Sequence, residues 1–178
     1  MIRLSRVADE HLPDDIRQRV QVICSDGAKL CLKPQNQFDR ILLDAPCSSE
    51  RHVLSAPTYL EQWSPARIKS LAIAQWALLS SAYRMIRPDG YILYATCALS
   101  PEENDKVVSR LEKKFCDVEY ISQLPLVPCN LGDFYAGELP EPEKTEKGFH
   151  VLPDKAKGAG PLYFALIHKK NLEEENAR

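Results

Sequence analysis

The chain has 178 residues, of which 44% are hydrophobic and 27% charged, a composition typical of a globular domain and not of collagen-like, disordered or coiled-coil chains. Its formal net charge of −2 gives no overall basic field, so a nucleic-acid partner would need a local basic patch. No apolar run approaches the roughly 20 residues of a membrane span, and the first residues lack the pattern of a signal peptide. We therefore expect a soluble domain with no membrane partner.

The cysteines indicate a reducing compartment. There are six, and none of them forms a C-x-x-C pair. They stand in apolar, strand-like stretches or beside proline and threonine, at Cys24, Cys31, Cys47, Cys97, Cys116 and Cys129. This pattern favours free thiols, and hence an intracellular location, over a disulfide framework or a metal site.

Two short β-rich runs come first along the chain, and each is followed by a carboxylate. Residues 20–24 lead into Ser25-Asp26-Gly27, and residues 38–43 lead into Asp44-Ala45-Pro46. A helix is expected next, from Ser64 as the N-cap and Pro65 as the first helical residue to about Ile86. Its apolar residues recur at helical spacing at Ile68, Leu71, Ala72, Trp76, Leu79, Tyr83 and Ile86.

The second half of the chain continues the alternation of strand and helix. The turn Arg87-Pro88-Asp89-Gly90 ends the helix, and residues 90–96 predict a third buried strand. Ser100-Pro101-Glu102-Glu103 has the form of a capping box that opens a helix toward Phe115. Residues 124–160 predict a long surface loop, residues 161–168 a last strand, and residues 169–178 a frayed polar end. The alternation predicts an α/β fold with a mostly parallel sheet.

Four reactive side chains follow the predicted strands: Asp26, Asp44, Cys47 and Cys97. Because ligands bind at the carboxyl ends of parallel strands, these groups are expected to meet at one edge of the sheet. Any one of them alone is explained as an incidental loop or buried residue; the four together indicate a site. Cys97 lies just before the expected helix at Ser100, whose positive end would favour a thiolate.

The motifs at these positions resemble a known family. Asp44-Ala45-Pro46-Cys47-Ser48, the later Thr96-Cys97 and the intervening Pro88-Asp89-Gly90 resemble the Sun/Fmu family of S-adenosylmethionine-dependent RNA (cytosine-C5) methyltransferases. The resemblance extends from about Leu4 to His168. Glu50-Arg51-His52 and residues 12–17 are most similar to the branch with the mitochondrial ribosomal-RNA and transfer-RNA enzymes, which implies a mitochondrial location, or otherwise a cytoplasmic one.

The resemblance implies a Rossmann-like class I methyltransferase sheet with an antiparallel C-terminal strand, and it implies roles for the site residues. Cys97 corresponds to the nucleophile that adds to C6 of the target cytosine, and Cys47 to the cysteine that assists release of the product. Asp44 corresponds to the carboxylate beside the methyl donor and the base, and Asp26 with Gly27 to a contact with the adenine side of S-adenosylmethionine. The target is expected in single-stranded or loop regions of ribosomal or transfer RNA, because the base must leave its stack.

The family's glycine-rich turn and its ribose-binding acid have no counterpart before Leu4. The only G-x-G, Gly158-Ala159-Gly160, precedes a strand. We therefore expect residues 1–170 to be a partial, N-terminally truncated catalytic domain without the first two strands, and 171–178 to be a polar tail. We also expect no complete cofactor pocket in this chain alone. The strand at 20–24 would then pair with the strand at 38–43, remain unpaired, or be completed by a second polypeptide or a second copy.

Other interpretations of the sequence remain open. The basic residues near the site either contact RNA phosphates or form a solvated helix face, at Arg51, His52, Arg67, Lys69, Arg84 and Arg87. Tyr59 and Trp63 are candidates to stack on a base. A non-catalytic RNA-binding or assembly partner is the main alternative to an enzyme. A thiol redox protein is a further one, and it predicts Cys47 and Cys97 within disulfide reach.

Overall fold

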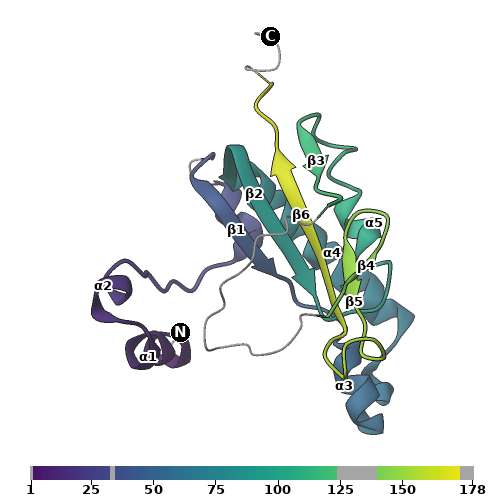
Figure 1. The fold of residues 1–178 in the computed structure, drawn as a ribbon. Coiled ribbons are helices and arrows are strands. Elements are labelled where there is room, and N and C mark those ends of the chain that lie inside the picture. Colours follow the sequence, from purple (N-terminus) through teal and green to yellow (C-terminus); the bar gives the residue numbers. More distant parts are fainter. Residues whose placement is uncertain (1, 33–34, 124–139, 173–178) are drawn as a thin grey trace.

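A mixed sheet with helices forms the centre of the protein (Figure 1). The computed structural model describes residues 2–32, 35–123 and 140–172. The strands lie in the order β1-β2-β6-β5-β4, and β3 also pairs with β6. Their bounds are β1 Phe38–Asp44, β2 Ile86–Thr96, β3 Val118–Tyr120, β4 Glu143–Lys144, β5 Phe149–Val151 and β6 Leu162–Lys169.

Strands β1 and β2 run parallel and end side by side. Asp44 at the end of β1 lies opposite Ala95, and the amide of Ala45 donates to the carbonyl of Ala95 at 2.9 Å. The register shifts near the start of β2, where Asp89 has a φ of +61° in the segment that was expected to be a turn. Strand β6 pairs antiparallel with β2, which confirms the expected antiparallel C-terminal strand. In the described part, β1 with β2 is the parallel pair and the other pairs are antiparallel.

The strand predicted at residues 20–24 is absent from the sheet. This segment is extended without strand pairing, and it lines an apolar groove of about 420 Å³ with α1 (Ile2–His11). An alternating apolar pattern forms a strand only where a neighbouring strand accepts its hydrogen bonds, and α1 offers side chains alone. In Figure 1, α1 and the short α2 (Asp14–Arg17) lie apart from the sheet.

Helix α4 (Pro65–Met85) begins and ends close to the predicted residues. The hydroxyl of Ser64 accepts from the amide of Arg67 at 3.2 Å, and Pro65 occupies the first turn, as expected. The helix packs against β1 and β2 and also against the 3-10 helix η1 (Gly27–Leu32). Its inward face buries Ile68, Leu79 and Tyr83.

The predicted length of the helix from Ser100 to Phe115 is wrong. Only α5 (Asp105–Val108) is α-helical, and turns flank it. Ser100 does not act as the capping residue, because its hydroxyl donates to Glu102 while Glu103 is drawn into the interior. The apolar residues of this segment nevertheless enter the core, as their spacing indicates.

The stretch expected to be a loop contains a hairpin. Strands β4 and β5 pair with each other, and β5 pairs with β6. Short strands of this kind are hard to predict where charge and proline dominate the composition. Residues 124–139 of the predicted loop and 173–178 of the predicted polar end lie outside the described residues.

The core lies between the sheet, α4 and α5. It is built around three tyrosines, Tyr83, Tyr94 and Tyr163, with aliphatic residues from β2, β6 and the α5 segment. Within the described ranges, no helix has the length and apolar character needed to cross a bilayer. The sheet ends at β1, whose outer edge pairs with no described strand.

Candidate active site

The two cysteines of the predicted site meet at the carboxyl ends of β1 and β2. Their sulfur atoms are 2.8 Å apart, and either thiol can donate to the other. The hydroxyl of Ser49 lies 3.9 Å from both sulfurs. Both cysteines are free and half-buried. The parallel register of β1 and β2 creates this meeting, since it places the chain after Asp44 beside the chain after Ala95.

Asp44 lies at the same end of the sheet and is exposed. As the last residue of β1 it precedes the loop that carries Cys47, and α3 (Glu50–Ser55) follows this loop (Figure 1). An exposed carboxylate beside two thiols can accept hydrogen bonds from a ligand that enters from solvent. The structure thus brings together Asp44, Cys47 and Cys97, whose roles stay predictions.

The acidity of Cys97 differs from the expectation. Burial, together with the neighbouring sulfur of Cys47, raises the pKa of Cys97 to about 11, whereas Ser49 acts in the opposite direction. No long helix starts at Ser100, so the thiol has no helix end to stabilise its negative charge. These surroundings therefore disfavour a Cys97 thiolate in the free chain, in contrast to the expectation from the helix end.

A buried glutamate that sequence reasoning assigned to a helix cap fixes the Cys47 loop. The carboxyl group of Glu103 accepts from the amide of Ser48 at 2.9 Å and also from the Ser48 hydroxyl. It accepts a further bond, at 2.9 Å, from the side chain of Gln75, which also donates to the carbonyl of Pro46 at 2.8 Å. The signal for this network was Gln75, a polar residue on the apolar face of the predicted helix.

Glu50 fixes the chain on the other side of Cys97. Its carboxyl group accepts from the amide of Leu99 at 2.8 Å and from the indole nitrogen of Trp63 at 3.2 Å. Glu50 is itself buried. The loops that carry the two thiols are thus tied to each other by carboxyl groups, one from each side of the site.

The predicted cofactor residues Asp26 and Gly27 lie on a different element. The carboxyl group of Asp26 accepts from the amide of Ala28 at 3.1 Å and forms an ion pair with Lys29 at 3.4 Å. Gly27 packs so closely on α4 that a Cβ there would lie 2.8 Å from Leu78. No described hydrogen bond or ion pair joins Asp26 to Asp44.

The fit of these residues to a nucleoside cofactor is partial. An apolar groove of about 340 Å³ between η1, β1 and α4 includes Gly27 but neither carboxylate. Gly27 therefore serves packing against the helix in this structure, and Asp26 already has local partners. In the described residues no cluster of histidine, cysteine and acidic side chains is arranged to hold a metal ion.

A larger groove, of about 750 Å³, is lined in part by Glu50 and Leu99, which follow the two cysteines in the chain. Its lining is largely apolar and is bordered by cations, at Glu50, Trp63, Pro65, Ile68, Lys69, Ala72, Leu99, Ser100, Glu102, Lys106, Val107 and Arg110. Trp63 is 38% and Tyr59 44% exposed, so both remain accessible to a base. Arg110 stacks over the ring of Trp76, which packs against the core as predicted.

Comparisons with known proteins agree on one family. A model of the family described as 16S rRNA methyltransferase RsmB/F matches residues 2–160. Ribosomal RNA small subunit methyltransferase F of Escherichia coli (strain K12) is 39% identical over 129 residues, which are 72% of this chain and 25% of that protein. The protein of the same name from Escherichia fergusonii is 41% identical over the same shares. The chain thus spans about a quarter of the length of these curated relatives.

Two solved structures share the fold. NSun6 from Pyrococcus horikoshii, determined with SFG, has a TM-score of 0.63 and 26% identity over 85% of this chain and 35% of that chain. The protein PH0851 has a TM-score of 0.71 and 23% identity over 94% of this chain and 35% of that chain. At this level of identity the likeness shows only that the two proteins share a fold. These likenesses confirm the predicted α/β fold class.

Proposed function

Because the chain belongs to the RsmB/F family of 16S rRNA methyltransferases, we propose that it carries the catalytic end of an enzyme that methylates C5 of a cytosine in ribosomal RNA. The observation that supports this proposal is the meeting of the Cys47 and Cys97 sulfurs, 2.8 Å apart, at the strand end where Asp44 is exposed. Two thiols and one carboxylate at one sheet end match the two-step covalent chemistry that such a methylation needs.

In the proposed reaction Cys97 is the nucleophile. Its sulfur bonds to C6 of the cytosine, which makes C5 electron-rich enough to accept a methyl group. Because burial raises the pKa of Cys97 to about 11, the attack includes the loss of a proton from this thiol to solvent. After methylation the proton on C5 leaves to solvent as the bond between sulfur and C6 breaks, and the released thiolate takes up a proton, so the free thiol returns.

Cys47 and Asp44 assist at different steps of this reaction. Cys47, in contact with the Cys97 sulfur, assists the elimination step. Asp44 accepts a hydrogen bond from the pyrimidine as charge develops on the ring. The target base reaches the half-buried thiols from a single-stranded or loop region, since it must leave its stack to do so.

S-adenosylmethionine, when bound, supplies the methyl group. The NSun6 structure, which was determined with the S-adenosylmethionine analogue SFG, supports this choice of cofactor. We propose that Asp44, Asp26 and Gly27 of this chain contact it. Asp26 must exchange its bonds to Ala28 and Lys29 for the ligand. A second polypeptide or a second copy beside β1 remains part of this proposal, because the outer edge of β1 pairs with no described strand. The mitochondrial branch, with its location, stays a prediction, and the relatives reported above are bacterial.

The first experiment measures the covalent adduct. The chain is mixed with S-adenosylmethionine and a small-subunit ribosomal RNA fragment, and the protein-RNA adduct is quantified on a denaturing gel. We expect Cys47→Ala to accumulate the adduct, because release is slowed, and Cys97→Ala to abolish it. Cys31→Ala, a half-buried cysteine on η1, is the matched control and behaves as the parent.

Calorimetry with S-adenosylmethionine separates the proposal from its alternatives. Micromolar binding that is lost in Asp26→Ala and Asp44→Ala supports an enzyme that binds its cofactor within this chain. A folded chain that binds RNA but no cofactor and forms no adduct favours the non-catalytic RNA-binding alternative. The short distance between the two sulfurs is also what the thiol redox alternative predicts, and that alternative requires neither RNA nor the cofactor.

A further inference from the structure

Three consecutive side chains, Glu103, Asn104 and Asp105, reach from one backbone segment to three different parts of the protein. Glu103 binds the Cys47 loop, as described above. Asn104 binds the chain on both sides of Cys97. Asp105 binds the turn of the β4-β5 hairpin. The segment therefore connects the hairpin to both thiol loops.

Asn104 is buried and holds the residues that flank Cys97. Its side-chain nitrogen, Nδ2, donates to the carbonyl of Ala98 at 2.9 Å, and its Oδ1 accepts from the hydroxyl of Thr96 at 2.6 Å. The Thr96 hydroxyl in turn accepts from the amide of Ala98 at 3.3 Å. The backbone around the nucleophile is thus closed into a small ring of hydrogen bonds.

The second hydrogen of the Asn104 amide points to a histidine. Nδ2 of Asn104 lies 3.1 Å from Nε2 of His150, on β5. Because the Ala98 carbonyl and the Thr96 hydroxyl fix which side of the Asn104 amide is nitrogen, Nδ2 is the donor and Nε2 of His150 must accept. His150 is therefore neutral, with its proton on Nδ1.

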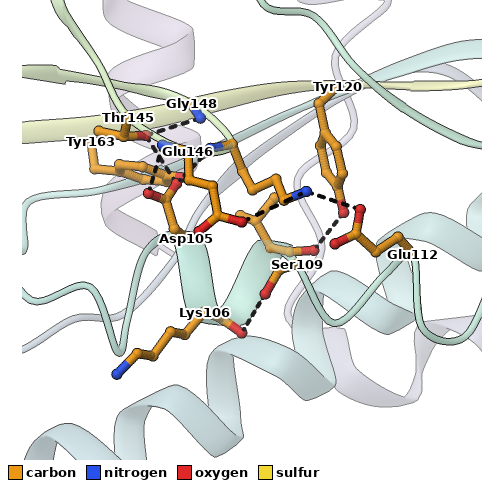
Figure 2. Close-up of polar contacts among 11 residues, drawn as sticks. Asp105, Lys106, Ser109, Glu112, Tyr120, Thr145, Glu146, Gly148 and Tyr163 are labelled. Carbon is orange, nitrogen blue, oxygen red and sulfur yellow. Dashed lines mark hydrogen bonds and ion pairs between the residues drawn. The ribbon is translucent and has the colours of Figure 1, made fainter.

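Asp105 binds the turn of the hairpin whose second strand carries His150, and Figure 2 shows the contacts of Asp105 with Thr145, Glu146 and Tyr163. Its carboxylate accepts from the hydroxyl of Thr145 at 2.9 Å, from the amides of Glu146 and Lys147 at 3.1 Å each, and from the hydroxyl of Tyr163 at 2.8 Å. The ring of His150 packs edge-on against Tyr163, with centroids 5.2 Å apart. The imidazole thus has a fixed position relative to Asn104.

The groups around His150 oppose one another in their effect on its charge. Burial disfavours the charged ring and is the largest effect, so the pKa of His150 lies below its ordinary value of 6.5. The carbonyl of Ala98 and the carboxylates of Asp105 and Glu143 favour the charged ring. The Ala98 carbonyl is the same oxygen that accepts from Asn104, so a protonated His150 competes with Asn104 for it.

We infer that Asn104 and His150 are positioning residues for Cys97: neutral His150 accepts from Asn104 and so holds the backbone on both sides of the thiol. This inference rests on the proposed role of Cys97 as the nucleophile. When His150 takes up a proton on Nε2, it becomes a donor, loses the bond from Asn104 and binds the Ala98 carbonyl instead. The Cys97 loop is then released and its thiol becomes more accessible.

The experiment measures the reactivity of Cys97 without RNA or cofactor, so it is independent of methyl transfer. Every protein carries Cys47→Ser, and dithiodipyridine forms a mixed disulfide on Cys97 with release of thiopyridone. Mass spectrometry of the Cys97 peptide gives the rate between pH 5 and pH 8. His150→Phe removes the acceptor, His150→Gln keeps an acceptor that does not titrate, and His168→Gln, on β6 beside Glu119, is the matched control.

We expect His150→Phe to raise the Cys97 rate at pH 7.5 by about threefold or more, because the released loop makes the thiol more accessible to the reagent. His150→Gln restores the parent rate at this pH. Below about pH 6.5 the parent reacts increasingly faster than His150→Gln, because only the parent histidine becomes charged. Circular dichroism and thermal unfolding of each variant report its fold.

Two results would overturn the inference: an unchanged rate in a folded His150→Phe, or identical pH profiles for the parent and His150→Gln. An equal effect of His168→Gln would do the same. If His150→Phe does not fold, Asn104→Asp replaces it, since a carboxylate cannot donate to the Ala98 carbonyl and must also accelerate Cys97. A failure of the methylation experiment leaves these rates unaffected, so the two proposals fail separately.

Discussion

The immediate surroundings of Cys97, above all its burial and the sulfur of Cys47, make its thiol less acidic than an ordinary cysteine. Both raise its pKa, to about 11, and Ser49 opposes them. We expect the alkylation rate of Cys97 by iodoacetamide to rise about tenfold per pH unit and to continue rising between pH 9 and pH 10. In Cys47→Ala the profile should bend at a lower pH, and the rate at pH 8 should be several-fold higher.

Mass spectrometry of the Cys97 peptide provides this measurement, and Cys31 in the same samples is the internal control. The Cys31 rate should be equal in parent and variant, since the contacts of Cys31 are to Ser81 and Ala28. A Cys47→Ala profile identical to that of the parent would show that burial alone sets the acidity of Cys97.

Glu103 has a structural effect that is large enough to measure. Glu103→Ala leaves the amide of Ser48 and one N–H of the Gln75 side chain without an acceptor in the interior. We expect the free energy of unfolding to fall by about 1–3 kcal/mol, the usual cost of a buried unpaired donor. Urea denaturation followed by circular dichroism checks this value.

The neighbouring Glu102 provides the control for Glu103. It is exposed, and its carboxyl group binds Lys106 and Ser100 on the surface. Glu102→Ala should change the free energy of unfolding by no more than about 0.5 kcal/mol. Equal losses in the two variants would contradict the special role assigned to the buried carboxyl group.

At the scale of elements, the cap of α4 provides a second stability prediction. Ser64→Ala removes the hydroxyl that accepts from the amide of Arg67, and we expect a loss of about 1 kcal/mol. Ser64→Asp keeps an acceptor at the same position and should retain most of the stability. Thermal unfolding distinguishes the two variants, and an equally stable Ser64→Ala would show that packing alone defines the start of α4.

The sequence predicted well those elements whose signals lie within the element itself or in the residues directly beside it. Helix α4 has its own cap, its own apolar face and a proline in the first turn, and β1, β2 and β6 carry strong β-forming residues. The convergence of Asp44, Cys47 and Cys97 followed from the rule for parallel strands alone.

The wrong predictions have a common physical reason: contacts with residues far away in the sequence determined the structure of these segments. Residues 20–24 have a strand pattern but line a groove with α1 and pair with no described strand, and Glu103 has a capping position but binds Ser48 and Gln75. The role of His150 depends on a hairpin whose strands were too short to predict. In each case the local pattern was compatible with two structures, and tertiary contacts selected one.

At the scale of the whole molecule, the sheet ends at β1, and no described strand pairs with the outer edge of β1. Strand β1 presents its outer edge, Leu42 is 70% and Phe38 45% exposed, and an apolar groove of about 340 Å³ lies between η1, β1 and α4. An open edge with exposed apolar residues pairs readily with another strand. The chain also spans only about a quarter of its curated relatives. We therefore expect this chain to associate with itself through β1.

A charge on the open strand tests this expectation. Leu42→Lys places a cation on the edge strand, which disfavours strand pairing, and should lower the average mass at tens of micromolar in sedimentation velocity. Ile73→Lys is the matched control, because Ile73 is an equally apolar residue that is 60% exposed on α4. If only Leu42→Lys yields monomers, β1 is the surface that self-associates. If both variants reduce the mass equally, general surface hydrophobicity causes the association, and if neither does, the edge of β1 is protected in solution.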